Sequence, residues 1–87
     1  MKNSLLEMLC KTQEVEELKK QVKKVEDLME QASKDADHYE KVKDKMSENI
    51  CANLYNIYNE TRLNTLLRIN KLEKEILEFE YNAVVNA

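Results

Sequence analysis

The chain contains no glycine and no proline in 87 residues. Compact domains of ordinary composition place these residues at many of their turns, at average frequencies of about 7% and 5%. A tight turn that requires a positive φ angle would have to use Asn or Asp here, so there can be very few such turns. Sandwiches, barrels and βαβ units need several of them, and the absence therefore predicts an all-α chain.

Composition separates a long helix from a disordered chain. Charged residues make up 36% of the sequence and aromatic residues only 6%, a profile that by itself suggests disorder. Apolar residues nevertheless make up 43%, and they recur at helical spacing. We therefore expect residues 1–87 to form a single helical domain, a long helical hairpin or coiled coil that assembles into a helical bundle.

The first half of the chain carries a heptad repeat. From Val15 to Tyr39 the apolar positions step by three and four residues. Such a repeat, sustained over three to four heptads, is typical of a coiled-coil seam rather than of the wider apolar stripe of a globular helix. The residues of this repeat that we predict to lie in an interface are Val15, Leu18, Val22, Val25, Met29 and Tyr39.

The segment 33–38 is the best candidate for a break in the helix. Ala32 and Ala36 thin the apolar series there, and Asp37 followed by Glu40 has the spacing of a capping box. We expect one helix over about residues 4–33, a soft break over about 33–38 and a second helix over about 38–82. A continuous helix of about 130 Å also fits the sequence. The hairpin is favoured because single chains usually bury an apolar stripe against themselves when they can.

The second half has a different character. Residues 47–87 contain ten charged residues, against 21 in residues 1–46, and eight of the nine asparagines. Their apolar stripe is broad, which predicts contact with more than one neighbour, and the heptad slips between Ile57 and Leu66, which we interpret as a stutter. Tyr55 and Tyr58 fit equally well as partner anchors or as core residues. The predicted interface continues with Ile50, Leu54, Tyr55, Ile57, Tyr58, Leu63, Leu66, Ile69, Leu72, Ile76 and Phe79.

No pattern in the sequence indicates catalysis or metal binding. His38 is the only histidine, Asp35 precedes it by three residues, and Cys10 and Cys51 lie 28 and 13 residues away, whereas a structural zinc site needs four ligands. A chain without glycine has no turn suited to an oxyanion hole or a phosphate loop. We expect no catalytic residue, no metal and no cofactor, and we interpret the two cysteines as small apolar residues.

Charge and hydropathy restrict the partners. The net charge is −3, whereas nucleic-acid modules normally concentrate positive charge on one surface, so direct nucleic-acid binding is disfavoured. No apolar run approaches the ~18 residues of a membrane span or has the pattern of a signal peptide. We expect an intracellular, cytoplasmic protein whose partners are protein helices, in a homo-oligomer or a hetero-oligomer.

In size, acidity and helix–break–helix plan, the chain resembles the small helical-hairpin co-chaperones of type III secretion. Its Tyr-Asn-Ala-Val-Val ending, residues 81–85, is similar to that of some members, although those proteins often carry a glycine or proline at their turn. The plan is equally similar to that of coiled-coil subunits of eukaryotic spindle, kinetochore and tethering complexes.

Three functions remain open from the sequence. The first is a non-enzymatic protein–protein interaction subunit that oligomerises or scaffolds through the seam and the wide C-terminal helix. The second, which the first resemblance implies, is a small chaperone or inhibitor that shields an apolar helix of a partner. The third is a nucleic-acid-associated accessory factor.

Overall fold

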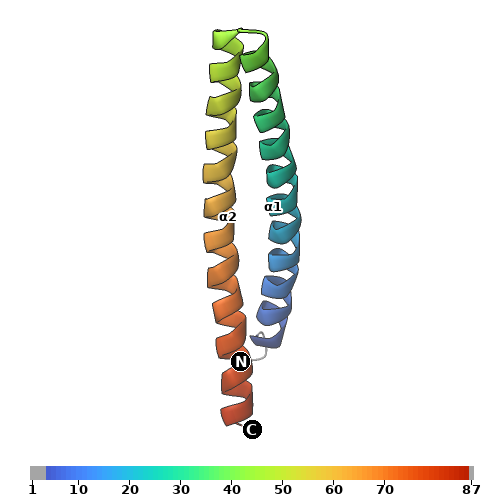
Figure 1. Cartoon of the computed structure of the whole chain (residues 1–87). Helices are drawn as coiled ribbons and strands as arrows, with labels where there is room; N and C mark the ends of the chain where they lie inside the picture. The colour runs from blue at the N-terminus through green and yellow to red at the C-terminus, as the bar shows by residue number, and fades with distance from the viewer. Residues whose placement is uncertain (1–3, 87) are drawn as a thin grey trace.

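The computed structural model describes residues 4–86, which form two long antiparallel helices joined by a short turn (Figure 1). Helix α1 is Ser4–Lys41 and helix α2 is Lys45–Val85. The hairpin is a narrow rod, with extents of 66 × 15 × 14 Å. The predicted all-α helical hairpin is confirmed.

The turn lies at residues 42–44 and not in the predicted segment 33–38. Ala32 is buried and Ala36 is half-buried on the side of α1 that contacts α2, so these small residues belong to the seam and do not interrupt it. The predicted end of the first helix near residue 33 and the predicted start of the second helix near residue 38 were therefore wrong. Helix α1 continues to Lys41, and α2 continues to Val85.

Lys43 occupies the turn position that glycine usually fills. Its φ angle is 60°, the only positive φ among residues 4–86. The backbone amide of Lys43 donates to the carbonyl oxygen of Glu40 (3.2 Å), and the amide of Asp44 donates to that of Tyr39 (2.9 Å). These two bonds are those of a Schellman motif. The expectation that a positive φ would fall on Asn or Asp was wrong, and this lysine carries a backbone cost of about 1–2 kcal/mol.

Asp44 caps the start of α2. Its carboxylate accepts a hydrogen bond from the Ser47 hydroxyl (2.8 Å) and another from the Ser47 backbone amide (3.1 Å). These bonds, the hydroxyl bond first, hold the pKa of the Asp44 carboxyl below its ordinary value because they favour the charged form. The second helix thus starts at the Asp44 cap and not at Asp37.

The two helices share one apolar seam. Its centre is a cluster of Val15, Val22, Ile69 and Leu72, with Leu72 only 1% exposed. Cross-helix ion pairs border the seam on both flanks. The Lys11 ammonium lies 3.0 Å from a Glu75 carboxylate oxygen and lowers the pKa of that carboxyl, chiefly through this hydrogen bond. The Arg68 guanidinium lies 3.2 Å from a Glu14 oxygen, and Lys19 lies 3.9 Å from Glu73.

The seam of α2 keeps its heptad spacing through the region where we predicted a stutter. Arg62 and Thr65 fill two seam positions and are half-buried, so the repeat continues there with polar residues. The Arg62 guanidinium donates to the Asn59 side-chain oxygen (3.2 Å) and lies 3.9 Å from a Glu26 carboxylate oxygen. The prediction of a stutter in this region was therefore wrong. The seam positions of α2 are Cys51, Tyr55, Tyr58, Arg62, Thr65, Ile69, Leu72, Ile76 and Phe79.

Candidate interaction surface

The residues predicted to form an interface divide into two groups in the structure. The larger group is buried or half-buried between α1 and α2, so it holds the hairpin together and is not available to another chain. It consists of Val15, Leu18, Val22, Val25, Met29, Tyr39, Tyr58, Leu66, Ile69, Leu72, Ile76 and Phe79. The second group stays exposed and consists of Ile50, Leu54, Tyr55, Ile57 and Leu63; of these, Tyr55 occupies a seam position but is still 39% exposed.

One side of α2 near the turn carries no charged side chain. Between residues 46 and 59 only Glu48 is charged, and it is half-buried at the edge of the seam. Met46 is 76% exposed and Ile57 is 57% exposed on the side of this stretch that points away from α1. Apolar and amide side chains therefore face solvent together. We call this surface the uncharged face, and its residues are Met46, Asn49, Ile50, Asn53, Asn56 and Ile57.

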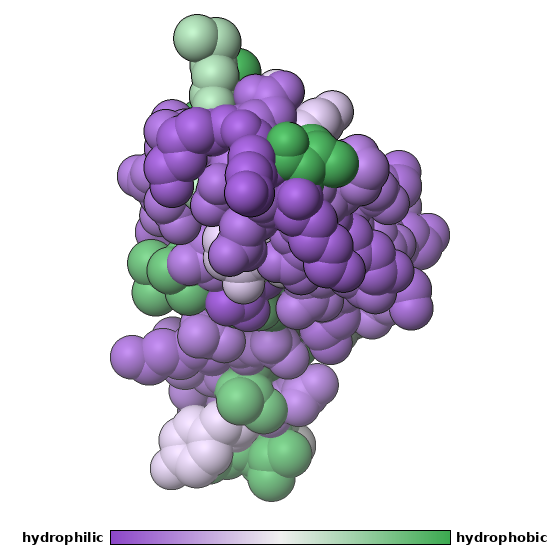
Figure 2. Space-filling view, turned by 45° about the horizontal axis from the view of Figure 1, so that its top comes forward, coloured by the Kyte–Doolittle hydropathy of each residue, from purple (hydrophilic) through white to green (hydrophobic). Residues whose placement is uncertain are grey.

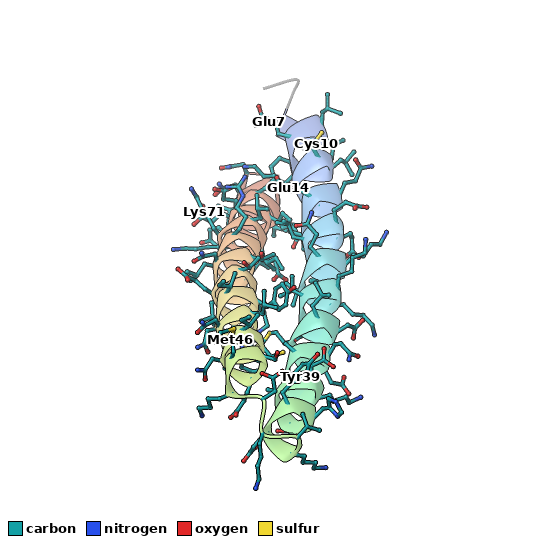
Figure 3. All side chains as sticks on the ribbon, turned by 90° about the horizontal axis from the view of Figure 1, so that it is seen from above. Glu7, Cys10, Glu14, Tyr39, Met46 and Lys71 are labelled. Atoms are coloured by element: carbon teal, nitrogen blue, oxygen red, sulfur yellow. The ribbon has the colours of Figure 1, made fainter. Side chains whose placement is uncertain are left out.

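Charged residues border the uncharged face at both ends, with opposite signs. Lys43 and Lys45 stand exposed at the turn end, and Glu60 stands exposed at the other. The Lys45 ammonium lies 3.7 Å from a Glu48 oxygen within the same helix. Further along α2 the outer side becomes charged, and Figure 3 shows Lys71 on the side of α2 that points away from α1.

Leu28 of α1, which was not among the predicted interface residues, extends the exposed apolar surface onto the first helix. It is 47% exposed. Leu28 comes two heptads after Glu14, and Leu54 comes two heptads before Arg68, the ion-pair partner of Glu14. The register of the hairpin thus places Leu28 and Leu54 on the same flank, opposite each other.

A second exposed apolar area lies at the end of the rod that holds both termini. Leu5 and Leu6 of α1 and Tyr81 and Val84 of α2 are all exposed there. Figure 2 shows hydrophobic side chains gathered at the lower end of the molecule, below a largely hydrophilic surface. Charged residues such as Glu80 are interspersed with this area, unlike the uncharged face.

Tyr55 lies at the edge of a shallow groove between the two helices, so it is less outward-facing than Ile57. The groove contains both acidic and basic side chains, and the Arg62 guanidinium reaches it from the seam. The residues that line it are Glu26, Met29, Glu30, Ser33, Lys34, Tyr55 and Arg62.

The described residues bring no three side chains of the His, Cys, Asp or Glu type into position to hold a metal ion. The His38 ring packs edge-on against Tyr39, with the ring centroids 5.3 Å apart. Cys51 is buried, whereas Cys10 is exposed, and both carry free thiols. Neither α1 nor α2 is long and apolar enough to cross a membrane.

The hairpin exposes much more surface than a compact chain of the same mass. Its accessible surface is 6987 Å², whereas a globular monomer of 10.3 kDa exposes about 5,400 Å². The difference of about 1,600 Å² is larger than the ~800 Å² that each partner contributes to a standard protein interface. The hairpin thus has ample surface for a stable complex.

Together these features define an antiparallel two-helix coiled coil with an uncharged outer face at its turn end. Comparisons with protein-family models, with curated proteins and with solved structures find no match to the chain.

Proposed function

We propose that this chain is a non-enzymatic protein-interaction subunit that binds helices through the surface left outside the hairpin seam. The uncharged face is the observation that carries the proposal. A helix with one face on water normally places charged and polar residues there. The core of a protein interface is instead depleted of charge, and the uncharged face has that composition.

The chemistry of the face indicates what it would bind. Met46, Ile50 and Ile57 offer aliphatic surface, and full burial of such a side chain contributes about 1.5–3 kcal/mol. The asparagine amides between them lose their water on binding and must regain hydrogen bonds from the partner. A suitable partner is therefore an amphipathic helix that supplies both apolar side chains and amide or hydroxyl groups.

Charge inserted in the face tests the proposal. The Ile50→Lys/Ile57→Lys variant should retain its helicity by circular dichroism, because neither residue is part of the seam, but should lose association measured by light scattering. The control is Gln13→Lys/Gln31→Lys on the exposed side of α1, which should associate like the parent chain. Association that survives the Ile50→Lys/Ile57→Lys change would refute this surface as the binding site.

The second candidate function, a small chaperone or inhibitor, is supported by the terminal end of the rod. Leu5, Leu6, Tyr81 and Val84 expose apolar surface from both helices where the hairpin is open. Leu6→Asp/Val84→Asp should then abolish protection of an aggregation-prone helical client in a turbidity assay. If this variant still protects the client, the terminal end of the rod is not the client-binding site. The nucleic-acid hypothesis gains no support from the net charge of −3.

We place this activity in the cytoplasm. An exposed free thiol such as that of Cys10 suits a reducing compartment. Alkylation of Cys10 in intact cells, compared with alkylation in the purified chain, tests this placement; a thiol found oxidised in cells would contradict it.

A further inference from the structure

We infer that a second copy of this chain covers the uncharged face, with the two α2 helices antiparallel about a two-fold axis beside Ala52 and Asn53. The inference rests on the proposed interaction function and specifies its partner. A two-fold interface uses the same patch on both subunits, so the patch must be complementary to itself. A face without charged residues meets this condition at its centre, because it brings no like charges together.

The spacing of the face matches a second helical seam. Met46, Ile50, Asn53, Ile57 and Glu60 follow one another by alternate steps of four and three residues, on the side of α2 opposite the first seam. This is the heptad spacing that two helices need to pack along their length. Asn53 is the polar residue in the middle of that series. In the two-fold arrangement Asn53 lies beside its own copy, so the two amides can hydrogen-bond to each other.

The charges at the ends of the face select the antiparallel arrangement. With the axis beside Ala52 and Asn53, Lys45 of one copy lies opposite Glu60 of the other, and the two-fold symmetry repeats this pair at the far end. In a parallel pair, Glu60 would face Glu60 and Lys45 would face Lys45. Like charges across an interface oppose association, so the parallel pair is disfavoured.

The asparagine side chains of the face also pair with each other in this register. Asn49 of one copy comes opposite Asn56 of the other, again twice by symmetry. An asparagine side chain carries both a donor group and an acceptor oxygen, so two of them can satisfy each other when water is removed. Ala52, next to the axis, is small enough to let the two backbones approach closely.

The charged outer side farther along α2 limits the overlap. Lys71 points away from α1 (Figure 3), and side-by-side parallel packing of two whole hairpins would bring it against its own copy. Overlap around residues 46–60 avoids this contact, so the hairpins extend in opposite directions. One hairpin is 66 Å long, and at about 1.5 Å of rise per residue the staggered dimer reaches about 100 Å.

The first test is mass and shape in solution. The full chain should have twice the 10.3 kDa mass of one copy by light scattering, with a maximum dimension by X-ray scattering of about 100 Å. Glu60→Lys and Lys45→Glu should each weaken the dimer by about tenfold. A mixture of these two variants should recover it, because every opposed pair then has opposite signs.

Disulfide trapping tests the orientation. In a Cys10→Ser/Cys51→Ala background, checked for retained helicity, Asn53→Cys should cross-link two copies under mild oxidation. Asn49→Cys should not, since its two copies lie about 10 Å apart along the helix axis. A mixture of Asn49→Cys and Asn56→Cys chains should cross-link. Self-linking of Asn49→Cys in place of these results would overturn the antiparallel pairing.

The outcomes separate this inference from the proposed function. A monomeric chain that binds another protein, and loses that protein in Ile50→Lys/Ile57→Lys, overturns the dimer and leaves the interaction function standing. A chain that remains monomeric and partner-free throughout overturns both. A dimer unaffected by Ile50→Lys/Ile57→Lys overturns the interface assigned here.

Discussion

The two stretches beside the turn, residues 28–41 of α1 and 46–59 of α2, have equal lengths and opposite surfaces. They lie antiparallel and contribute to the same seam, with Met29 and Ala32 buried from α1 and Cys51 buried from α2. The α1 stretch contains six charged residues and the α2 stretch contains one. Both are helical throughout, so folding of the hairpin does not require an uncharged outer side. The proposed binding site on α2 rests on that difference.

Both stretches depend on the one seam, and a cavity in it should have the largest effect. Leu72 is 1% exposed, so Leu72→Ala should lower the free energy of unfolding by about 2–5 kcal/mol through lost burial and the cavity left behind. Thermal melting followed by circular dichroism measures this change. The control is Leu67→Ala on the exposed side, which should remain near the parent value; equal losses for the two variants would contradict the assignment of the seam.

The α2 side of the seam is less apolar than the α1 side, and one substitution can reduce this difference. Thr65 is half-buried and Thr61 is exposed, and each hydroxyl donates to the carbonyl oxygen four residues earlier. Thr65→Val should raise the free energy of unfolding by about 1 kcal/mol because it adds buried apolar surface. Thr61→Val, the matched control, should change it by less than about 0.5 kcal/mol. Urea unfolding measures both free energies. If Thr65→Val is not more stable than Thr61→Val, the seam does not pass through residue 65.

The turn between the two stretches contains a backbone cost that glycine would remove. Lys43→Gly should stabilise the hairpin by up to about 1 kcal/mol, since glycine adopts a positive φ freely. Lys24→Gly, at an exposed position in the interior of α1, should destabilise it by a similar amount. Chemical denaturation measures both free energies of unfolding. If both glycine variants are destabilised, Lys43 does not adopt the left-handed conformation.

The smallest effect concerns pH at the same turn. The folded pKa of Asp44 lies below its unfolded value, because the Ser47 hydroxyl and amide donate to the carboxylate. The cap's stabilisation is therefore complete above the ordinary aspartate range, about pH 4–5, and is lost as the pH falls through the lowered pKa. Asp44→Ser keeps a capping oxygen that does not titrate there, so its melting temperature should fall less than the parent's on acidification. Parallel pH profiles of the two chains would contradict this role.

Much of the architecture was predictable from the sequence, and the failures have physical causes. The Val15–Tyr39 repeat was visible because its members are apolar at nearly every step. The α2 repeat was lost between Ile57 and Leu66 because Arg62 and Thr65 take seam positions as polar residues. The turn was misplaced because Ala32 and Ala36 have short side chains, and short side chains fit a close helix contact as well as they fit a break. The positive φ of Lys43 could not be predicted from the sequence, since lysine is rarely found at positive φ.

The uncharged face was only partly predictable. The excess of asparagine and the breadth of the apolar stripe were both visible, and they led to the expectation of a further neighbour. Which residues stay outside the hairpin was not visible.

By itself, the sequence determined that the chain is helical, that it has at most one or two breaks, and that α1 buries its heptad positions. It did so because a chain without glycine or proline has few alternatives to helix, and because that repeat has one apolar residue per step. Only the tertiary structure decided which side of α2 is inside. The sequence offers adjacent candidates, Ile50 with Cys51 and Ile57 with Tyr58, and neighbouring residues point about 100° apart on a helix. The position of α1 selects Cys51 and Tyr58 and leaves the isoleucines exposed.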